Sequence, residues 1–561
     1  MRVSEDRSAA EDRSSRKQSE DHASEQPSAA EDHASEQPSD DDAWLDAVRR
    51  GMAVAHWAAV HPDAPAVVEG DRVSTFAELN AQANRLVRAL RVRGVGPGAG
   101  IALLCANRTE FVEVVVAADR AGLRLTPVNW HLTADEAAYI IDDCEATAVV
   151  ADARFRDVAV AATRHAVGAT VRLAVGADID GFESYADALA PEAGDDIDEP
   201  CIGIRMLYTS GTTGRPKGVH RDAATAAPGA ITTAALARAS GYRPGRGQLH
   251  LCTGPLYHAA PLQLSLVVPQ TGGVGVVLMD GWDARATLEL IEHHRVTHTH
   301  MVPIMFHRLL SLPPEEKSRH DLSSLSFVVH GAAPCPVPVK QAIIDWWGPI
   351  VAEYYAATEG AGTVVLSHDW LQRPGTVGRP DTPDHILVLG EDGDVLPAGE
   401  VGTVYLKAPD EGRFDYFKDA GKTAGAYRGG YYTLGDVGYL DAEGFLFLTD
   451  RSANLIISGG VNVYPAEVEA VLIGHPAVGD VGVVGVPDLE WGEEVVAVVE
   501  PQPGVDGTPE LAAELLEWCR PRLARFKWPR RVDFVEALPR HDNGKLYRQV
   551  LRARYRVAAQ A

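Results

Sequence analysis

Strand-like and helix-like apolar segments alternate along the chain from about Trp44 onward. Ile101–Cys105 is a continuous apolar run of strand length, Glu110–Ala118 has helical spacing, and Ala148–Ala151 is strand-like again. A strand, a helix and another strand in succession are typical of parallel sheets covered by helices. The sequence therefore predicts an α/β fold, with mixed sheets and helices in a large N-terminal domain.

A smaller unit follows Arg451. It contains predicted strands at 455–458, 481–486 and 494–499 and predicted helices at 465–472 and 511–523. A chain of 561 residues is too long for one core. We therefore expect a large domain over 41–449, a hinge at 450–454, and a small mobile α+β domain over 455–555.

The first 40 residues have a different composition. Glu20–Ser28 recurs as Glu31–Ser39, and the segment is rich in Ser, Glu and Asp with few apolar residues. Such a segment cannot bury enough surface to fold, so 1–40 is predicted to be a disordered acidic tail. The net charge of −26 disfavours nucleic acid as a partner. We find no membrane-spanning run and no secretory signal, which predicts a cytoplasmic protein.

The segment Tyr208–Lys217 is the strongest chemical motif. Three glycines allow close backbone approach to a ligand, while hydroxyls, N–H groups and two cations, Arg215 and Lys217, can bind phosphate oxygens. The spacing differs from that of a Walker loop. The residues expected to bind phosphate here are Thr209, Ser210, Gly211, Thr212, Thr213, Gly214 and Lys217.

These ten residues resemble the signature of the adenylate-forming superfamily, in its acyl-CoA synthetase branch of fatty-acid or aryl-acid CoA ligases. The resemblance extends from about residue 45 to 555, with several motifs in family order. It implies an AMP-forming acid–thiol ligase that uses ATP, Mg²⁺ and CoA. The small domain is implied to rotate between adenylate formation and acyl transfer.

Two further motifs would complete the nucleotide site. Tyr355–Glu359 matches the family's Tyr-Gly-x-Thr-Glu except for Ala356 in place of Gly. An aromatic ring can stack on adenine, Thr358 can bind phosphate, and Glu359 is a hard oxygen ligand suited to Mg²⁺. In similar enzymes the turn after a strand at 325–329 lines adenine and the acyl group. Its residues here are Gly331, Ala332 and Ala333.

Asp436, Arg451 and Lys545 are ordinary polar residues when taken singly. A carboxylate at Asp436 could accept both ribose hydroxyls. The resemblance assigns Asp436 to ribose, Arg451 to ribose or phosphate, and Lys545 to the acid's carboxylate and the α-phosphate. It also implies a pantetheine channel at Ser458, Gly459 and Gly460. The usual hinge position holds Ala453, where relatives most often carry Asp or Lys.

The acyl pocket is expected to be roomy and apolar. Amino-acid-activating relatives hold an α-amine with an acid in the stretch that here reads Gly254–Pro261, which contains none. We therefore expect a hydrophobic acid that is fatty, aryl or bulky and polycyclic. The predicted lining residues are Tyr257, His258, Ala332, Ala357 and Gly360.

Two alternatives remain open at this point. The acyl acceptor could be the phosphopantetheine of a carrier protein instead of free CoA. The chain could also be a non-catalytic adenylate-binding partner protein, which the intact set of motif residues disfavours. A homodimer is a further expectation.

Overall fold

The computed structural model describes residues 40–209, 216–410, 412–451, 454–458, 461–488, 491–541 and 544–558. The predicted tail lies outside these ranges except for its last residue, Asp40, which begins helix α1. Helix α1 (Asp40–Arg49) therefore starts four residues before Trp44, the position near which the sequence predicts the folded part to begin. Three acidic residues in the first turn of α1 favour this start, because they face the positive end of the helix dipole.

An eight-stranded sheet forms the centre of the large domain, in the order β16-β15-β14-β13-β11-β12-β1-β2. Strands β11, β13, β14 and β15 are adjacent and parallel, so their carboxyl ends lie at one edge. The strands are β16 (Gly360–Val365), β15 (Val351–Ala357), β14 (Phe327–His330), β13 (His298–Met301), β11 (Leu249–Cys252), β12 (Gly275–Leu278), β1 (Pro65–Glu69) and β2 (Arg72–Thr75).

A second, six-stranded sheet is parallel throughout, as the βα alternation predicted. Its order is β7 (Glu183–Ser184), β6 (Val171–Val175), β5 (Ala146–Asp152), β3 (Gly100–Leu104), β4 (Arg124–Pro127) and β8 (Ile204–Arg205). Helix α4 (Thr109–Arg120) contacts β1 of the first sheet and both β3 and β4 of the second, so one apolar core joins the two sheets.

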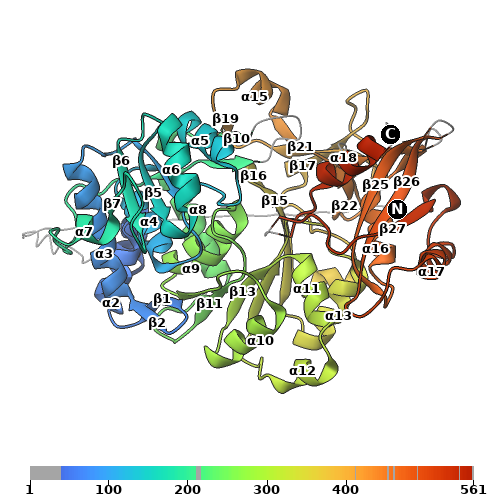
Figure 1. Cartoon of the computed structure of the whole chain (residues 1–561), viewed down its shortest axis with the longest axis horizontal. Helices are drawn as coiled ribbons and strands as arrows, with labels where there is room; N and C mark the ends of the chain where they lie inside the picture. Colours follow the sequence, from blue (N-terminus) through green and yellow to red (C-terminus); the bar gives the residue numbers. More distant parts are fainter. Residues whose placement is uncertain are drawn as a thin grey trace, which may run out of the picture.

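Helices cover both sheets (Figure 1). Around the first half of the chain they are α2 (Ala53–Val60), α3 (Phe76–Val92), α5 (Ala134–Asp143), α6 (Arg156–His165), α7 (Tyr185–Leu189), α8 (Ala226–Ala239) and α9 (Val268–Thr271). Beside the eight-stranded sheet lie α10 (Ala284–His293), α11 (Pro303–Leu310), α12 (Pro314–Arg319), α13 (Val337–Trp347) and α14 (Ser367–Gln372). No helix in the described ranges is long and apolar enough to cross a bilayer.

Two antiparallel sheets complete the large domain. A three-stranded sheet has the order β19 (Asp415–Tyr416), β10 (Lys217–His220) and β9 (Leu207–Thr209), followed along the chain by α15 (Ala420–Ala426). A five-stranded sheet has the order β17 (Ile386–Leu389), β18 (Gly402–Lys407), β21 (Tyr431–Leu440) and β20 (Tyr427–Arg428), with β22 (Leu446–Arg451) paired to β21.

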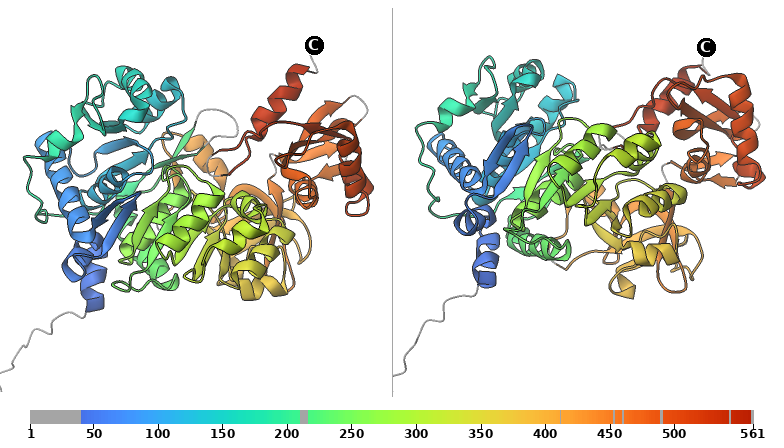
Figure 2. Two further views of the ribbon diagram at one scale, coloured as in Figure 1. Left: turned by 60° about the horizontal axis from the view of Figure 1, so that its bottom comes forward. Right: turned by 90° about the horizontal axis from the view of Figure 1, so that it is seen from below.

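The C-terminal part has a sheet of its own, seen at the right of Figure 1 and in two further views in Figure 2. Its strands are β24 (Val461–Val463), β23 (Ile456–Ser458), β26 (Gly492–Pro501) and β25 (Val478–Asp488), with β27 (Arg531–Phe534) on β26. Its helices are α16 (Pro465–Leu472), α17 (Pro509–Cys519) and α18 (Arg548–Ala558). The predicted helix to Leu523 is too long, because α17 ends at Cys519.

Candidate active site

The carboxyl ends of β11, β13, β14 and β15 bring most of the predicted motifs to one edge of the central sheet. Tyr257 and His258 follow β11, Gly331 to Ala333 follow β14, and Thr358 and Glu359 follow β15. Ligand sites in open α/β sheets form at this edge, because loops from several neighbouring parallel strands converge there. The fold therefore gathers segments that lie about 100 residues apart in the sequence.

Thr358 and Glu359 form the two-residue tip of a β-hairpin. Ala357 of β15 pairs with Gly360 of β16, so the chain reverses through these two residues alone. The Tyr416 hydroxyl donates to Glu359 Oε1 at 2.9 Å, and Arg221 Nη2 donates to the Glu359 carbonyl at 2.5 Å. Both the backbone and the carboxylate of Glu359 are therefore held in place.

The Tyr355 hydroxyl donates to Asp436 Oδ2 at 2.7 Å in a buried contact. Asp436 is 6% exposed and lies on β21, directly opposite Arg451 of β22. Asp436, which is predicted to bind ribose, is therefore adjacent to Tyr355, which is predicted to contact adenine, and to the Arg451 backbone. Up to 96 positions separate these residues in the sequence. The Arg451 side chain lies outside what the structure describes.

The phosphate motif is carried by the hairpin β9–β10, in which Lys217 pairs with Thr209. Residues Ser210, Gly211, Thr212, Thr213 and Gly214 lie outside the described residues. Lys217 Nζ contacts Asp419 Oδ2 at 2.9 Å, and this hydrogen bond raises the pKa of Lys217. Lys217 is thus a cation at neutral pH, positioned beside the loop's C-terminal end.

Sequence reasoning missed several groups around Glu359. Lys422 Nζ lies 4.0 Å from the centroid of the Tyr416 ring, and burial lowers the pKa of this lysine despite the nearby Glu359 carboxylate. Arg221 and Lys422 place positive charge beside the hairpin tip, and Lys217 lies near Lys422. No motif marks Tyr416 or Lys422; only the pairing of β19 with β10 brings them here.

Ala332 adopts φ +67°, a left-handed conformation that is unfavourable for a residue with a side chain. It lies in the turn that leaves β14, and such strained turns occur most often at functional sites. Gly331 beside it packs closely on a neighbour, since a Cβ there would lie 2.6 Å from the Tyr354 ring. The turn is thus fixed by Tyr354, one strand away.

The small residues do not simply leave open space. A Cβ on Gly360 would lie 2.1 Å from the Tyr432 hydroxyl, and one on Gly362 would lie 2.6 Å from the Tyr355 ring. At these two positions and at Gly331 the missing side chain accommodates a tyrosine of the protein. On the side where a Cβ would project, these glycines therefore leave no room for an acyl group. The assignment of Gly360 and Ala357 to the acyl pocket stays a prediction.

Tyr257 is 6% exposed and belongs to an aromatic cluster. The centroid of its ring lies 6.0 Å from that of Trp130, which stacks on Phe155 at 5.1 Å. Trp130 follows β4 of the other sheet, so no local sequence pattern indicates that it contacts Tyr257. The segment after His258 continues as a π-helix over Pro261–Val267, a conformation that is frequent at functional sites.

The predicted catalytic lysine approaches the same edge from the small domain. The His541 and His258 ring centroids lie 6.4 Å apart, and the Gly544 backbone packs on Val302 and Ile304 just after β13. Burial, with the nearby charges of His541 and Lys545, lowers the pKa of His258 to about 3. His258 is therefore neutral at working pH and adds no charge beside Lys545.

Three predicted residues, Ala453, Gly459 and Gly460, lie outside the described residues. Ser458 is buried at the end of β23. The predicted hinge at 450–454 includes the last two residues of β22 and ends before β23, and the domain boundaries stay predictions.

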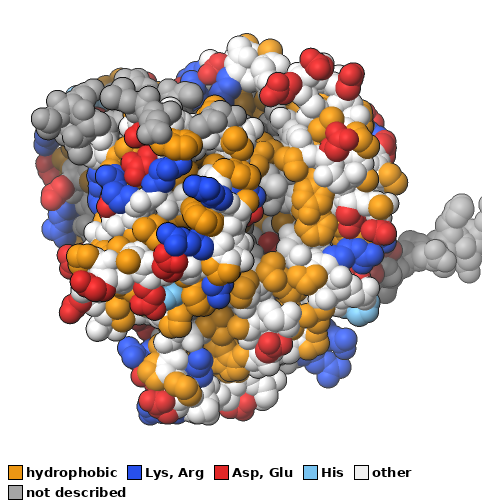
Figure 3. Space-filling view, turned by 90° about the vertical axis from the view of Figure 1, so that its right-hand side faces the viewer, with side chains coloured by type: hydrophobic (Ala, Val, Ile, Leu, Met, Phe, Trp, Pro, Cys, Tyr) orange, Lys and Arg blue, Asp and Glu red, His pale blue; other side chains and the backbone are white. Residues whose placement is uncertain are grey.

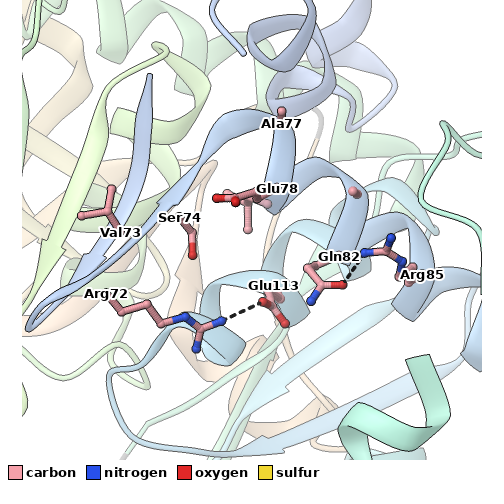
Figure 4. Close-up of a pocket in the computed structure, with 10 residues that line it drawn as sticks. Arg72, Val73, Ser74, Ala77, Glu78, Gln82, Arg85 and Glu113 are labelled. Carbon is pink, nitrogen blue, oxygen red and sulfur yellow. Dashed lines mark hydrogen bonds and ion pairs between the residues drawn. The ribbon is translucent and has the colours of Figure 1, made fainter. Parts of the chain in front are cut away.

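A cavity of about 490 Å³ lies elsewhere, between β2, α3 and α4 (Figure 4). Glu113 lines this cavity. Burial raises the pKa of Glu113 to about 7. Tyr185 donates to Glu113 Oε2 at 2.8 Å, and Arg72 contacts both Glu110 and Glu113 at 3.1 and 4.0 Å. These charged groups are paired within the chain, and the cavity contains none of the predicted site residues.

Comparison with known proteins agrees with this geometry. The model of the AMP-binding enzyme family matches residues 54–412, and that of the AMP-binding enzyme C-terminal domain matches 467–545. The chain belongs to this family. The fold and the class predicted from the sequence, an AMP-forming acid–thiol ligase of the adenylate-forming superfamily, are confirmed.

Three similar proteins illustrate the range of the family. The long-chain-fatty-acid–CoA ligase FadD13 of Mycobacterium tuberculosis is 35% identical over 90% of this chain and 98% of its own. The fatty acid–[acyl-carrier-protein] ligase ScoC of Streptomyces coeruleorubidus is 32% identical, over 88% of this chain and 94% of its own. The structure of the anthranilate CoA ligase AuaEII in complex with anthranoyl-AMP superposes with a TM-score of 0.80 at 25% identity. The superposition covers 91% of this chain and 98% of AuaEII.

Proposed function

We propose that this AMP-binding enzyme joins a hydrophobic carboxylic acid to CoA through an acyl-adenylate. One observation carries the proposal: the Lys545 turn of the small domain docks on the sheet edge that holds His258, Thr358 and Glu359. A carboxylate must approach an anionic triphosphate, so a cation between them is the chemical requirement. Lys545 is the candidate for this cation, because its turn contacts the sheet edge beside His258, a predicted residue of the acyl pocket.

In the first step a carboxylate oxygen attacks the α-phosphorus of ATP, and pyrophosphate leaves. Tyr355 and Asp436 orient the adenosine, while Lys217, Lys422 and the hydroxyls of the phosphate loop hold the leaving phosphates. Lys545 neutralises charge between the carboxylate and the α-phosphate. Catalysis of this kind depends on positioning and on charge stabilisation more than on covalent chemistry.

Mg²⁺ fits one position in this arrangement. No three His, Cys, Asp or Glu side chains converge on a metal position in the part of the chain that the structure describes. Mg²⁺ in such enzymes needs only one or two carboxylates, because substrate phosphates and water complete its shell. Glu359 would hold the ion, which would neutralise phosphate charge. The ordered carboxylate, fixed by Tyr416, suits this role.

In the second step the CoA thiolate attacks the acyl carbon, and AMP leaves. Lys545 must withdraw for this attack, which the small domain achieves by rotating about the hinge. Five exposed arginines between 520 and 531 give this domain positive charge for the phosphates of CoA, in a chain of net charge −26. Figure 3 shows Lys and Arg side chains gathered on one side of the face that contains this domain.

A carrier protein is the second candidate acceptor, because ScoC acts on an acyl-carrier protein and matches 88% of this chain. We favour free CoA because FadD13 and AuaEII are CoA ligases. The cytoplasmic location and the homodimer stay predictions.

The test is ATP–pyrophosphate exchange across a panel of acids, from hexanoate to hexadecanoate, with benzoate, anthranilate and a steroid acid. Mass spectrometry then identifies the thioester formed with CoA or with a phosphopantetheinylated carrier. Exchange with an apolar acid and an acyl-CoA product are expected. No exchange with any acid of the panel, or labelling of the carrier alone, would contradict the proposal.

A further inference from the structure

The turn that carries Lys545 is fixed to the small domain by its own contacts. Arg540 binds both carboxylate oxygens of Asp480, at 2.5 and 2.6 Å, and donates to the Gly544 carbonyl at 2.7 Å. The His541 amide donates to the Lys545 carbonyl at 2.9 Å, which closes the turn. Asp480 is 1% exposed, so this bidentate pair is a rigid base for the turn.

Gly544 is the point at which the turn meets the large domain. Its φ is +78°, and a Cβ there would lie 2.8 Å from Val302 Cγ2 and 2.8 Å from Ile304 Cγ2. Contacts between real Cβ atoms and carbon are essentially never below 3.0 Å, so any side chain would lift the turn. Val302 directly follows β13, in the middle of the edge that holds the nucleotide residues.

Val302, on the large-domain side of this contact, is held in place by its packing. Val302 is 4% exposed, and the neighbouring Met305 and Phe306 belong to the apolar cluster that also includes Val478 and Val481 of the small domain. Protein interiors are close-packed, so a displaced Val302 would disturb that cluster. The added methyl group would therefore move the turn and not the sheet edge.

We propose that the bare backbone of Gly544 is a positioning element that sets how deeply Lys545 enters the adenylation site. The inference rests on the role proposed for Lys545. Its consequence is specific to one half-reaction: a side chain at 544 displaces Lys545 while the domains are docked for adenylation. The same side chain leaves acyl transfer unaffected, because Lys545 has then withdrawn. A displacement of about 1 Å in a catalytic group can cost about 10²-fold in rate.

The test compares Gly544→Ala with Gly504→Ala and Lys545→Ala. Gly504 is a matched control in the same domain, because its φ is +84° and no atom lies within 4 Å of a Cβ placed there. We expect pyrophosphate exchange, with the best acid of the panel, to fall about 10- to 100-fold in Gly544→Ala and less than threefold in Gly504→Ala. CoA thioester formation from synthetic acyl-AMP should stay within threefold of wild type in both, which also shows that they are folded.

Equal exchange rates in Gly544→Ala and Gly504→Ala would overturn the inference, even if Lys545→Ala is inactive in exchange. Full exchange in Lys545→Ala would instead overturn the role of the lysine.

A readout independent of the acid uses the contact of Gln502 Nε2 with Ser311 Oγ, 3.1 Å apart across the two domains. With cysteines at both positions in a Cys201→Ser background, a short bis-maleimide should cross-link Gly544→Ala several-fold more slowly than Gly504→Ala. Equal rates would again contradict the inference.

Discussion

The proposed site has two halves that are held in different ways: the nucleotide half, on the large domain, and the lysine half, the turn of the small domain that carries Lys545. The nucleotide half lies on strands of the large domain and is held by short hydrogen bonds, such as Tyr355 to Asp436 and Tyr416 to Glu359. The lysine half meets it through close packing at Gly544, a ring contact at His541, a hydrogen bond from Gln502 and an apolar cluster that the two domains share. Many directional bonds suit a site that is prebuilt, whereas contacts that consist mostly of packing suit a part that we propose detaches.

Lys545→Ala gives the largest expected effect, because it removes the cation proposed to lie between the carboxylate and the α-phosphate. Losing a preorganised contact to charge that develops in the transition state costs about 10²–10³-fold in rate. Pyrophosphate exchange should fall by this factor, with little change in the KM for ATP. A rise in that KM with kcat intact would place Lys545 in nucleotide binding instead.

Glu359→Gln tests the nucleotide half. The glutamine keeps an oxygen that can accept from Tyr416 but has no charge for Mg²⁺, so exchange should fall about 100-fold. The dependence on Mg²⁺ concentration should shift to higher values. Tyr416→Phe is the control, since it loosens the carboxylate without removing its charge and should cost less. An unchanged Mg²⁺ dependence in Glu359→Gln would remove this residue from metal binding.

Tyr355→Phe removes one buried hydrogen bond to Asp436 and keeps the ring. Hydrogen bonds to charged groups contribute about 1.5–3 kcal/mol, so the KM for ATP should rise about tenfold or more. Thioester formation from acyl-AMP should also weaken, because AMP occupies the same pocket in that step. An effect on pyrophosphate exchange alone would show that the nucleotide half is not common to both steps.

Gln502→Ala should change exchange by less than about fivefold, since an exposed hydrogen bond contributes about 1 kcal/mol or less. Gln502 has a second bond to the Val478 carbonyl within its own domain at 3.2 Å. A loss above tenfold would mean that docking depends on this single contact, which would weaken the contrast between the two halves.

Glu113→Gln should leave both half-reactions unchanged and alter only stability. The pKa of Glu113 is raised from 4.5 to about 7, so between those values the folded protein keeps a proton that the unfolded chain has lost. Stability therefore falls as pH rises through this window. Because glutamine does not titrate, the variant should be more stable than wild type at pH 8, by up to about 3 kcal/mol, and equal near pH 4.5. A lower Tm at pH 8 would contradict this.

The sequence predicted the elements that depend on local residue patterns. The predicted strand at 148–151 and the predicted helices at 110–118 and 465–472 lie within β5, α4 and α16. The predictions failed where a contact depends on tertiary packing. Nothing local indicates that Tyr432 fills the space beside Gly360 or that Trp130 meets Tyr257, because these neighbours come from other sheets.

The most direct test of the two-part site is to lock the halves together. Cysteines at 311 and 502, joined by a short bis-maleimide in the Cys201→Ser background, would hold the small domain in the docked arrangement. We expect the locked enzyme to keep pyrophosphate exchange and to lose acyl-CoA formation by about tenfold or more, while the unlinked variant performs both. Acyl-CoA formation by the locked enzyme at the unlinked rate would contradict the two-part site.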